Sequence, residues 1–109
     1  MNFRYFLDDA ARLSIREELV WLEEKLGDET ADIWMEALEK CLDAITVHPE
    51  RNGFAPESAW LVAGAEIRQK RFRPWKGKPG WRVLYVIDAD ARKVKILQIR
   101  SERQPWLEG

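Results

Sequence analysis

Two runs of apolar residues at helical spacing, separated by one glycine, constrain the fold of this chain most strongly. In each run the apolar residues recur at intervals of four, three and four positions. The members are Ile15, Leu19, Leu22 and Leu26 in the first run, and Trp34, Leu38, Cys41 and Ile45 in the second. Such intervals place apolar residues along one side of a helix. Because Gly27 can adopt the left-handed conformation that often ends a helix, the pattern predicts two helices folded back as a hairpin.

The start of the first helix is marked by two acidic residues. Residues 1–7 are short and rich in aromatics, which favours an opening strand. Asp8 and Asp9 follow, and an Asp carboxylate can accept hydrogen bonds from the free amides of a first helical turn. We therefore expect the first helix at about residues 9–26.

The second helix has its own start and stop signals. Asp28 can cap it, and it should end before His48 and Pro49, because proline disfavours a helical conformation in the preceding residue and lacks an amide hydrogen. Residues 49–64 contain an Asn-Gly pair, two prolines and little periodicity. They predict a loop with a turn of helix near residues 58–61.

The last part of the chain is strand-like. Residues 81–87 and 94–99 are largely apolar and predict the central strands of a sheet, joined by a turn at 88–92. Residues 65–72 are polar and predict an edge strand, followed by a basic loop at 73–80. The order is an N-terminal strand, an α-helix hairpin and a three-stranded antiparallel meander. It predicts one α+β domain with both helices on one face of the sheet.

Charge is divided unevenly along the chain. Residues 1–50 carry five Lys and Arg against 13 Asp and Glu, a net charge of −8, whereas residues 51–109 carry 13 against six, or +7. Residues 66–87 contain a single acidic residue, Glu66. The basic residues of this segment are Arg68, Lys70, Arg71, Arg73, Lys76, Lys78 and Arg82. One end of the sheet should therefore be cationic, either to bind a polyanion or to balance the acidic helices.

Other classes of protein are disfavoured by composition. The 109 residues suit one domain, and the single cysteine, Cys41, excludes an internal disulfide and is expected to be a buried thiol. His48 is the only histidine and lies apart from Cys41 in the chain, so no metal site or other cofactor is expected. With neither a signal-like run nor an apolar stretch of membrane-spanning length, we expect a cytoplasmic protein.

The order of these elements and several of their sequence words resemble the RelE/ParE superfamily of toxins from bacterial type II toxin-antitoxin pairs. The words are ALEKCLDAITVHPER, APES, EIRQ, WRVLYVIDAD and VKILQIRSER, in the superfamily's order over most of the chain. The resemblance implies a toxin held inactive by a cognate antitoxin. It also implies one of two targets: RelE-like members cut messenger RNA on the ribosome, and ParE-like members act on DNA gyrase.

The resemblance also suggests site residues. Arg82, within WRVLY, stands where RelE-like nucleases carry a strand arginine, and Glu57, within APES, matches a general-base glutamate of one nuclease branch. Arg68, Arg100 and Arg103 are further cationic candidates. RNA cleavage without a metal needs a base, an acid and cations around the phosphate, and arginine suits the last role. A nuclease therefore requires Arg68, Arg82, Arg100 and Glu57 to converge on one open surface.

Several observations favour other interpretations of the same residues. The nucleases usually carry a His or Tyr after the last strand, where this chain has residues 102–106, so no general acid is evident. His48 is expected at the surface. Trp106 could stack on a base or fold back on the core. Arg82 could simply pair with Glu66 or Asp88.

Two alternatives concern partners. Trp21 and Trp34 are expected in the packing of the hairpin, and either one, if exposed, would mark the groove for the antitoxin. A basic sheet also holds phosphates without any catalytic residue, so a non-toxic RNA- or DNA-binding module is the alternative function.

Overall fold

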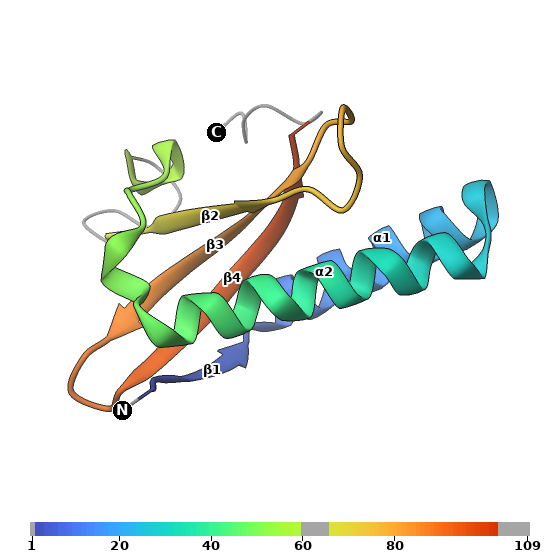
Figure 1. The fold of residues 1–109 in the computed structure, drawn as a ribbon. Helices are drawn as coiled ribbons and strands as arrows, with labels where there is room; N and C mark the ends of the chain where they lie inside the picture. The colour runs from blue at the N-terminus through green and yellow to red at the C-terminus, as the bar shows by residue number, and fades with distance from the viewer. Residues whose placement is uncertain (1, 60–65, 103–109) are drawn as a thin grey trace.

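The computed structural model describes residues 2–59 and 66–102, which form an α+β fold with two long helices against a four-stranded sheet (Figure 1). The strands and long helices are β1 (Arg4–Leu7), α1 (Asp9–Leu26), α2 (Asp28–Val47), β2 (Arg68–Phe72), β3 (Trp81–Asp88) and β4 (Lys93–Ser101). Two short 3-10 helices, η1 (Pro49–Arg51) and η2 (Pro56–Ala59), lie between α2 and β2. The predicted order of elements and the α+β fold are confirmed.

The sheet has the strand order β1-β4-β3-β2. The apolar strands β3 and β4 lie at its centre and the polar β2 lies at an edge, as their composition predicts. The opening strand β1 forms the other edge by pairing in parallel with β4, in a register that sets Tyr5 against Val94. This parallel pairing joins the first strand of the sheet to the last one along the chain, and it was not predicted.

Both helices pack on one face of the sheet, as predicted (Figure 1). The whole α2 stripe is buried, and its Trp34 ring packs against both Phe72 and Trp81, with ring centroids 5.9 Å away in each case. In α1, Ile15 and Leu22 are buried. Leu26 is 57% exposed, which corrects its assignment to the buried stripe: it lies at the last turn of α1, where the hairpin extends past the sheet.

The helix ends differ in detail from the prediction. Asp8 precedes α1, but its carboxylate makes no capping hydrogen bond and instead lies 3.6 Å from the Lys95 ammonium on β4. Gly27 has a φ of 97° and serves as the cap residue of both helices, so Asp28 is the first residue of α2 and not its cap. The turn between the two helices therefore consists of Gly27 alone.

The opposite face of the sheet is partly covered by the segment between α2 and β2. Ala55, Ile67 and Leu84 form a small second core there. The Ser58 hydroxyl receives a hydrogen bond from the Ile67 amide and donates one to the Ile67 carbonyl, at 3.0 and 2.8 Å. These bonds hold Ile67 outside the ladder, so β2 begins at Arg68 and not at residue 65 as expected; residue 65 itself lies outside the described part.

The structure also shows the environment of the single cysteine. Cys41 is a buried free thiol, as expected. Among the helices of the described ranges, none is long and apolar enough to cross a bilayer. In residues 2–59 and 66–102, no group of three or more His, Cys, Asp and Glu side chains is placed to hold a metal ion.

Candidate functional site

The centre of the candidate site is a buried pair of charges on the sheet face opposite the helices. Arg82 lies on β3 and is 4% exposed, and Glu57 lies in η2 and is fully buried. The Arg82 guanidinium donates two hydrogen bonds to the two carboxylate oxygens of Glu57, at 2.9 and 2.6 Å. This two-point geometry matches a planar guanidinium to a planar carboxylate. Arg82 therefore pairs with Glu57, and not with Glu66 or Asp88 as the sequence suggested.

A second arginine converges on the same carboxylate. Arg100 on β4 lies directly opposite Arg82 in the ladder, and its Nε is 3.7 Å from Glu57 Oε2. That Nε is buried and has no hydrogen-bond partner. Two amide side chains complete the cluster: Gln69 accepts a bond from Arg82 at 2.8 Å, and Gln98 accepts one from Arg100 at 3.3 Å. The cluster holds two positive charges against one negative charge.

Burial and the neighbouring charges shift the pKa values of Glu57 and Arg100. Burial alone would raise the pKa of Glu57, but the hydrogen bonds from Arg82 and the backbone, with the charges of Arg82 and Arg100, outweigh it and lower that pKa. Burial lowers the pKa of Arg100, and the charge of Arg82 acts in the same direction while Glu57 opposes it. Glu57 is thus held as a carboxylate and is poorly suited to receive a proton as a general base near neutral pH.

Arg68 does not join this cluster. Its guanidinium lies 4.6 Å from the Phe54 ring and donates to the backbone carbonyls of Glu50 and Asn52, at 3.1 and 2.5 Å. It lies opposite Tyr85 in the ladder, three residues along β2 from Arg71, the partner of Arg82. Successive side chains of a strand point to opposite faces, so Arg68 and Arg71 project to opposite sides of the sheet.

The open four-residue site that RNA cleavage requires is therefore not assembled. Arg82, Arg100 and Glu57 converge, but Arg82 and Glu57 are buried, only 12% of the Arg100 side chain is exposed, and Arg68 lies elsewhere. Arg103 lies outside the described residues, as does Trp106. His48 is at the surface as expected, near Glu50, and it is not part of the cluster.

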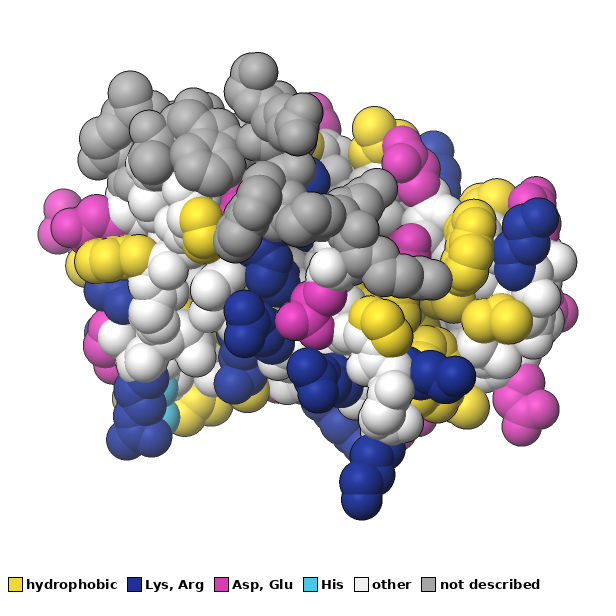
Figure 2. Space-filling model, turned by 90° about the horizontal axis from the view of Figure 1, so that it is seen from above, with side chains coloured by type: hydrophobic (Ala, Val, Ile, Leu, Met, Phe, Trp, Pro, Cys, Tyr) yellow, Lys and Arg dark blue, Asp and Glu magenta, His cyan; other side chains and the backbone are white. Residues whose placement is uncertain are grey.

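Four exposed cations lie close together at the end of β2 and in the loop that follows. Figure 2 shows Lys and Arg side chains gathered across the middle of the face seen from above. We call Arg71, Arg73, Lys76 and Lys78 the basic edge; all four are exposed. Glu102 lies 3.5 Å from Arg71 and 3.7 Å from Arg73, so one acid is shared by two of these bases. The cationic end of the sheet expected from the sequence is thus present.

Sequence reasoning missed one polar network, which links β3 to η1 and the residue that follows it. The Tyr85 hydroxyl donates a hydrogen bond to the Pro49 carbonyl at 2.6 Å and accepts one from the Asn52 amide at 2.9 Å. Tyr85 is fully buried in the core, and burial raises its pKa. The one available signal was a tyrosine in a largely apolar strand, because a buried hydroxyl needs a partner.

Comparison with known proteins identifies relatives of this chain. The family described as "ParE toxin of type II toxin-antitoxin system, parDE" matches residues 5–106. Among curated protein sequences, none matches significantly.

Solved structures share the fold. A chain of the chromosomal ParDE toxin-antitoxin system of P. aeruginosa is 12% identical with a TM-score of 0.68, over 91% of this chain and 95% of that one. An E. coli RelE mutant in the free state is 17% identical with a TM-score of 0.56, over 92% and 83%. The RelBE2 complex of Mycobacterium tuberculosis contains a chain 19% identical with a TM-score of 0.55, over 93% and 99%.

Proposed function

The chain belongs to the ParE toxin family of type II toxin-antitoxin systems, and from this premise we propose that it arrests growth by inhibiting DNA gyrase and is held inactive by a cognate antitoxin. The family supplies the class of protein and the antitoxin. The choice of gyrase over messenger RNA rests on the site.

One observation carries that choice. The guanidinium of Arg82, the arginine that a RelE-like nuclease would direct at the phosphate, is bonded at two points to Glu57 and is 4% exposed. Taking a charge out of such a buried pair leaves its partner uncompensated, which is costly. An arginine in this position stabilises the fold and is a poor ligand for a transition-state phosphate. Glu57, in the same pair, is a poor base.

The basic edge offers the remaining charged surface. Arg71 and Arg73 expose more than three-fifths of their side chains, and Lys76 and Lys78 are exposed beside them. Such a surface suits an acidic region of the gyrase-DNA assembly, because long-range attraction speeds the encounter of opposite charges. Binding there does not require any catalytic residue in the toxin.

The experiment compares the two targets directly. We expect the purified protein to inhibit gyrase supercoiling and to leave ribosome-bound messages uncut in primer extension. An Arg71→Ser/Arg73→Ser double variant should lose inhibition, and Lys40→Ser, which removes an exposed lysine from α2, should keep it. New cleavage within codons with unchanged supercoiling would overturn the proposal. Salt-sensitive binding to nucleic acid with unaffected growth would indicate a non-toxic binding module instead.

A further inference from the structure

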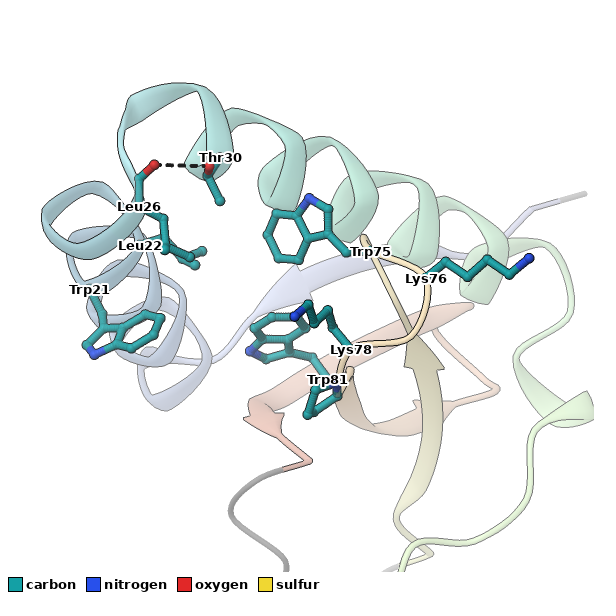
Figure 3. A pocket seen from close by; sticks show the side chains of 9 residues that line it. Trp21, Leu22, Leu26, Thr30, Trp75, Lys76, Lys78 and Trp81 are labelled. Carbon is teal, nitrogen blue, oxygen red and sulfur yellow. Dashed lines mark hydrogen bonds between the residues drawn. The ribbon is translucent and has the colours of Figure 1, made fainter.

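The Asn52-Gly53 pair lies in an open part of the segment between α2 and β2. Asn52 follows η1 and is half-buried, and Gly53 is exposed and belongs to no helix or strand. Asn52 borders a hollow of about 390 Å³ at the C-terminal end of α2, so solvent water reaches it. The aromatic hollow at the other end of α2, around Trp75 and Trp81, shares no lining residue with it (Figure 3).

The backbone amide nitrogen of Gly53 is a nucleophile next to the Asn52 side chain. Within residues 2–59 and 66–102, no group accepts a hydrogen bond from this amide, whereas the Gly53 carbonyl accepts one from the Gln69 amide at 3.0 Å. Glycine carries no side chain that would hinder the nitrogen, and its backbone rotates more freely than that of any other residue. The nitrogen can therefore reach the side-chain carbonyl carbon, Cγ, of Asn52.

The Asn52 amide is restrained by one contact with the core. Its nitrogen donates a hydrogen bond to the Tyr85 hydroxyl at 2.9 Å. A single hydrogen bond between neutral groups contributes only a modest net free energy, so the side chain is released from it repeatedly. The bond slows an attack on Cγ and does not prevent it.

We propose that Asn52 is a site of spontaneous deamidation, with the Gly53 amide nitrogen as nucleophile and water as co-reactant, and that the product loosens the segment that carries Glu57. The Gly53 nitrogen bonds to Asn52 Cγ, the bond from Cγ to the side-chain nitrogen breaks, and ammonia leaves with the proton that Gly53 gives up. Water then opens the resulting succinimide ring. Opening at Cγ leaves aspartate, and opening at the backbone carbonyl leaves isoaspartate. This inference is independent of the proposed function.

Both products lose the contact with Tyr85. A carboxylate has no hydrogen to donate, so the bond from residue 52 to the Tyr85 hydroxyl disappears. The hydroxyl cannot simply turn toward the new carboxylate, because its one hydrogen is already donated to the Pro49 carbonyl at 2.6 Å. Turning it would leave that carbonyl without its partner, which costs free energy at a buried site.

The isoaspartate has a further effect, since it inserts one methylene group into the main chain. The residues that follow pair with the start of β2: the Gly53 carbonyl accepts a bond from the Gln69 amide, and the Ala55 amide donates one to the Ile67 carbonyl at 2.7 Å. A longer main chain puts these bonds out of register. Because Glu57 follows on the same segment, the buried ion pair loses part of its support.

The test follows the modification by peptide-mapping mass spectrometry while the folded chain is incubated in mildly alkaline buffer. We expect Asn52 to be converted progressively, and Asn2, the other asparagine, to stay largely intact because the bulky Phe3 follows it. Gly53→Ala should slow the conversion several-fold. The added methyl group meets no atom within 4 Å, and thermal melts verify that this variant folds. Equal conversion in the wild type and Gly53→Ala would overturn the proposal, as would an Asn52 that lasts as long as Asn2.

Two further measurements address the folded state and the effect of the product. In urea the conversion should be faster, because the Tyr85 contact is absent; conversion in urea alone, with none in the folded chain, would overturn the proposal. Ion exchange separates the deamidated molecules by their added negative charge, and their urea midpoint should lie below that of the unmodified chain. Asn2→Asp adds the same charge at an exposed residue and should keep the midpoint. Equal midpoints for deamidated and unmodified chains would contradict the loosening.

Discussion

Arg82 and Glu57 lie 25 residues apart in the sequence and form a buried two-point ion pair, with bonds of 2.9 and 2.6 Å. The pair fastens η2 to the centre of the sheet, on the face that the helices leave uncovered. The pair also explains why these two charged side chains can be buried, because each compensates the charge of the other. Each of the two charges therefore depends on the other for compensation.

Removing one member of the pair should be costly. We expect Glu57→Ala to lower the free energy of unfolding by about 3 to 5 kcal/mol, because it leaves the Arg82 charge buried without its partner. Urea denaturation measures the change. Glu24→Ala, on the exposed side of α1, is the control and should change it by less than about 0.5 kcal/mol. A loss below about 1 kcal/mol for Glu57→Ala would contradict a buried pair.

The same carboxylate predicts an acid-sensitive stability. The pKa of Glu57 is lowered in the folded state from its ordinary value of 4.5, so its contribution is fully present above that pH. It is lost as the pH falls below 4.5 and through the folded-state pKa. Urea midpoints measured from neutral pH downward should fall more steeply for the wild type than for Glu57→Gln. Parallel curves would show that Glu57 does not carry the effect.

Tyr85 provides a test of the network that ties η1 to β3. Tyr85→Phe removes the donor to the Pro49 carbonyl and the acceptor for Asn52, and we expect a loss of about 1 to 3 kcal/mol in unfolding free energy. Tyr5→Phe alters a tyrosine that is 39% exposed on β1 and should change stability by less than about 0.5 kcal/mol. Equal effects of the two substitutions would exclude a special role for the Tyr85 hydroxyl.

Cys41 should be inert in the folded protein. Burial raises its pKa to about 11, with the nearby charge of Lys70 acting weakly in the other direction, so almost no thiolate exists near pH 8. A thiol reagent such as DTNB should therefore react slowly with the native chain and rapidly after denaturation. Cys41→Ser should give no signal in either state. Rapid reaction of the native wild type would place the thiol at the surface.

Two glycines offer a matched pair of substitutions. A Cβ on Gly80 would lie 2.6 Å from both the Phe72 carbonyl oxygen and Glu102 Oε1, and one on Gly53 would meet nothing within 4 Å. We expect Gly80→Ala to lower the unfolding free energy by about 1 to 3 kcal/mol, because the backbone of β2 must shift. Gly53→Ala should change it by less than about 1 kcal/mol. Equal melting temperatures would show that the loop yields without cost.

Several elements of this fold are specified by local patterns in the sequence. The 4-3-4 spacing of apolar residues fixed both helices, and the stop at His48 and Pro49 follows from the backbone chemistry of proline. The apolar character of β3 and β4 and the polar character of β2 fixed the centre and the edge of the sheet. These properties arise between neighbouring residues, so they can be read without the fold. The resemblance to toxins of toxin-antitoxin pairs was also present in the sequence and is confirmed.

Contacts between distant segments could not be predicted from local patterns and depend on the folded structure. Glu57 comes from a segment with little periodicity, so no local pattern indicated that it would meet Arg82. The parallel pairing of β1 with β4 likewise joins segments that are distant in the sequence. Leu26 is exposed because the packed hairpin extends past the sheet. Charge counts predicted a basic end of the sheet. In the structure, Arg82 is buried in its pair with Glu57, whereas Arg71 and Arg73 remain exposed at the basic edge. Desolvation and distance, which a linear sequence does not contain, make that separation.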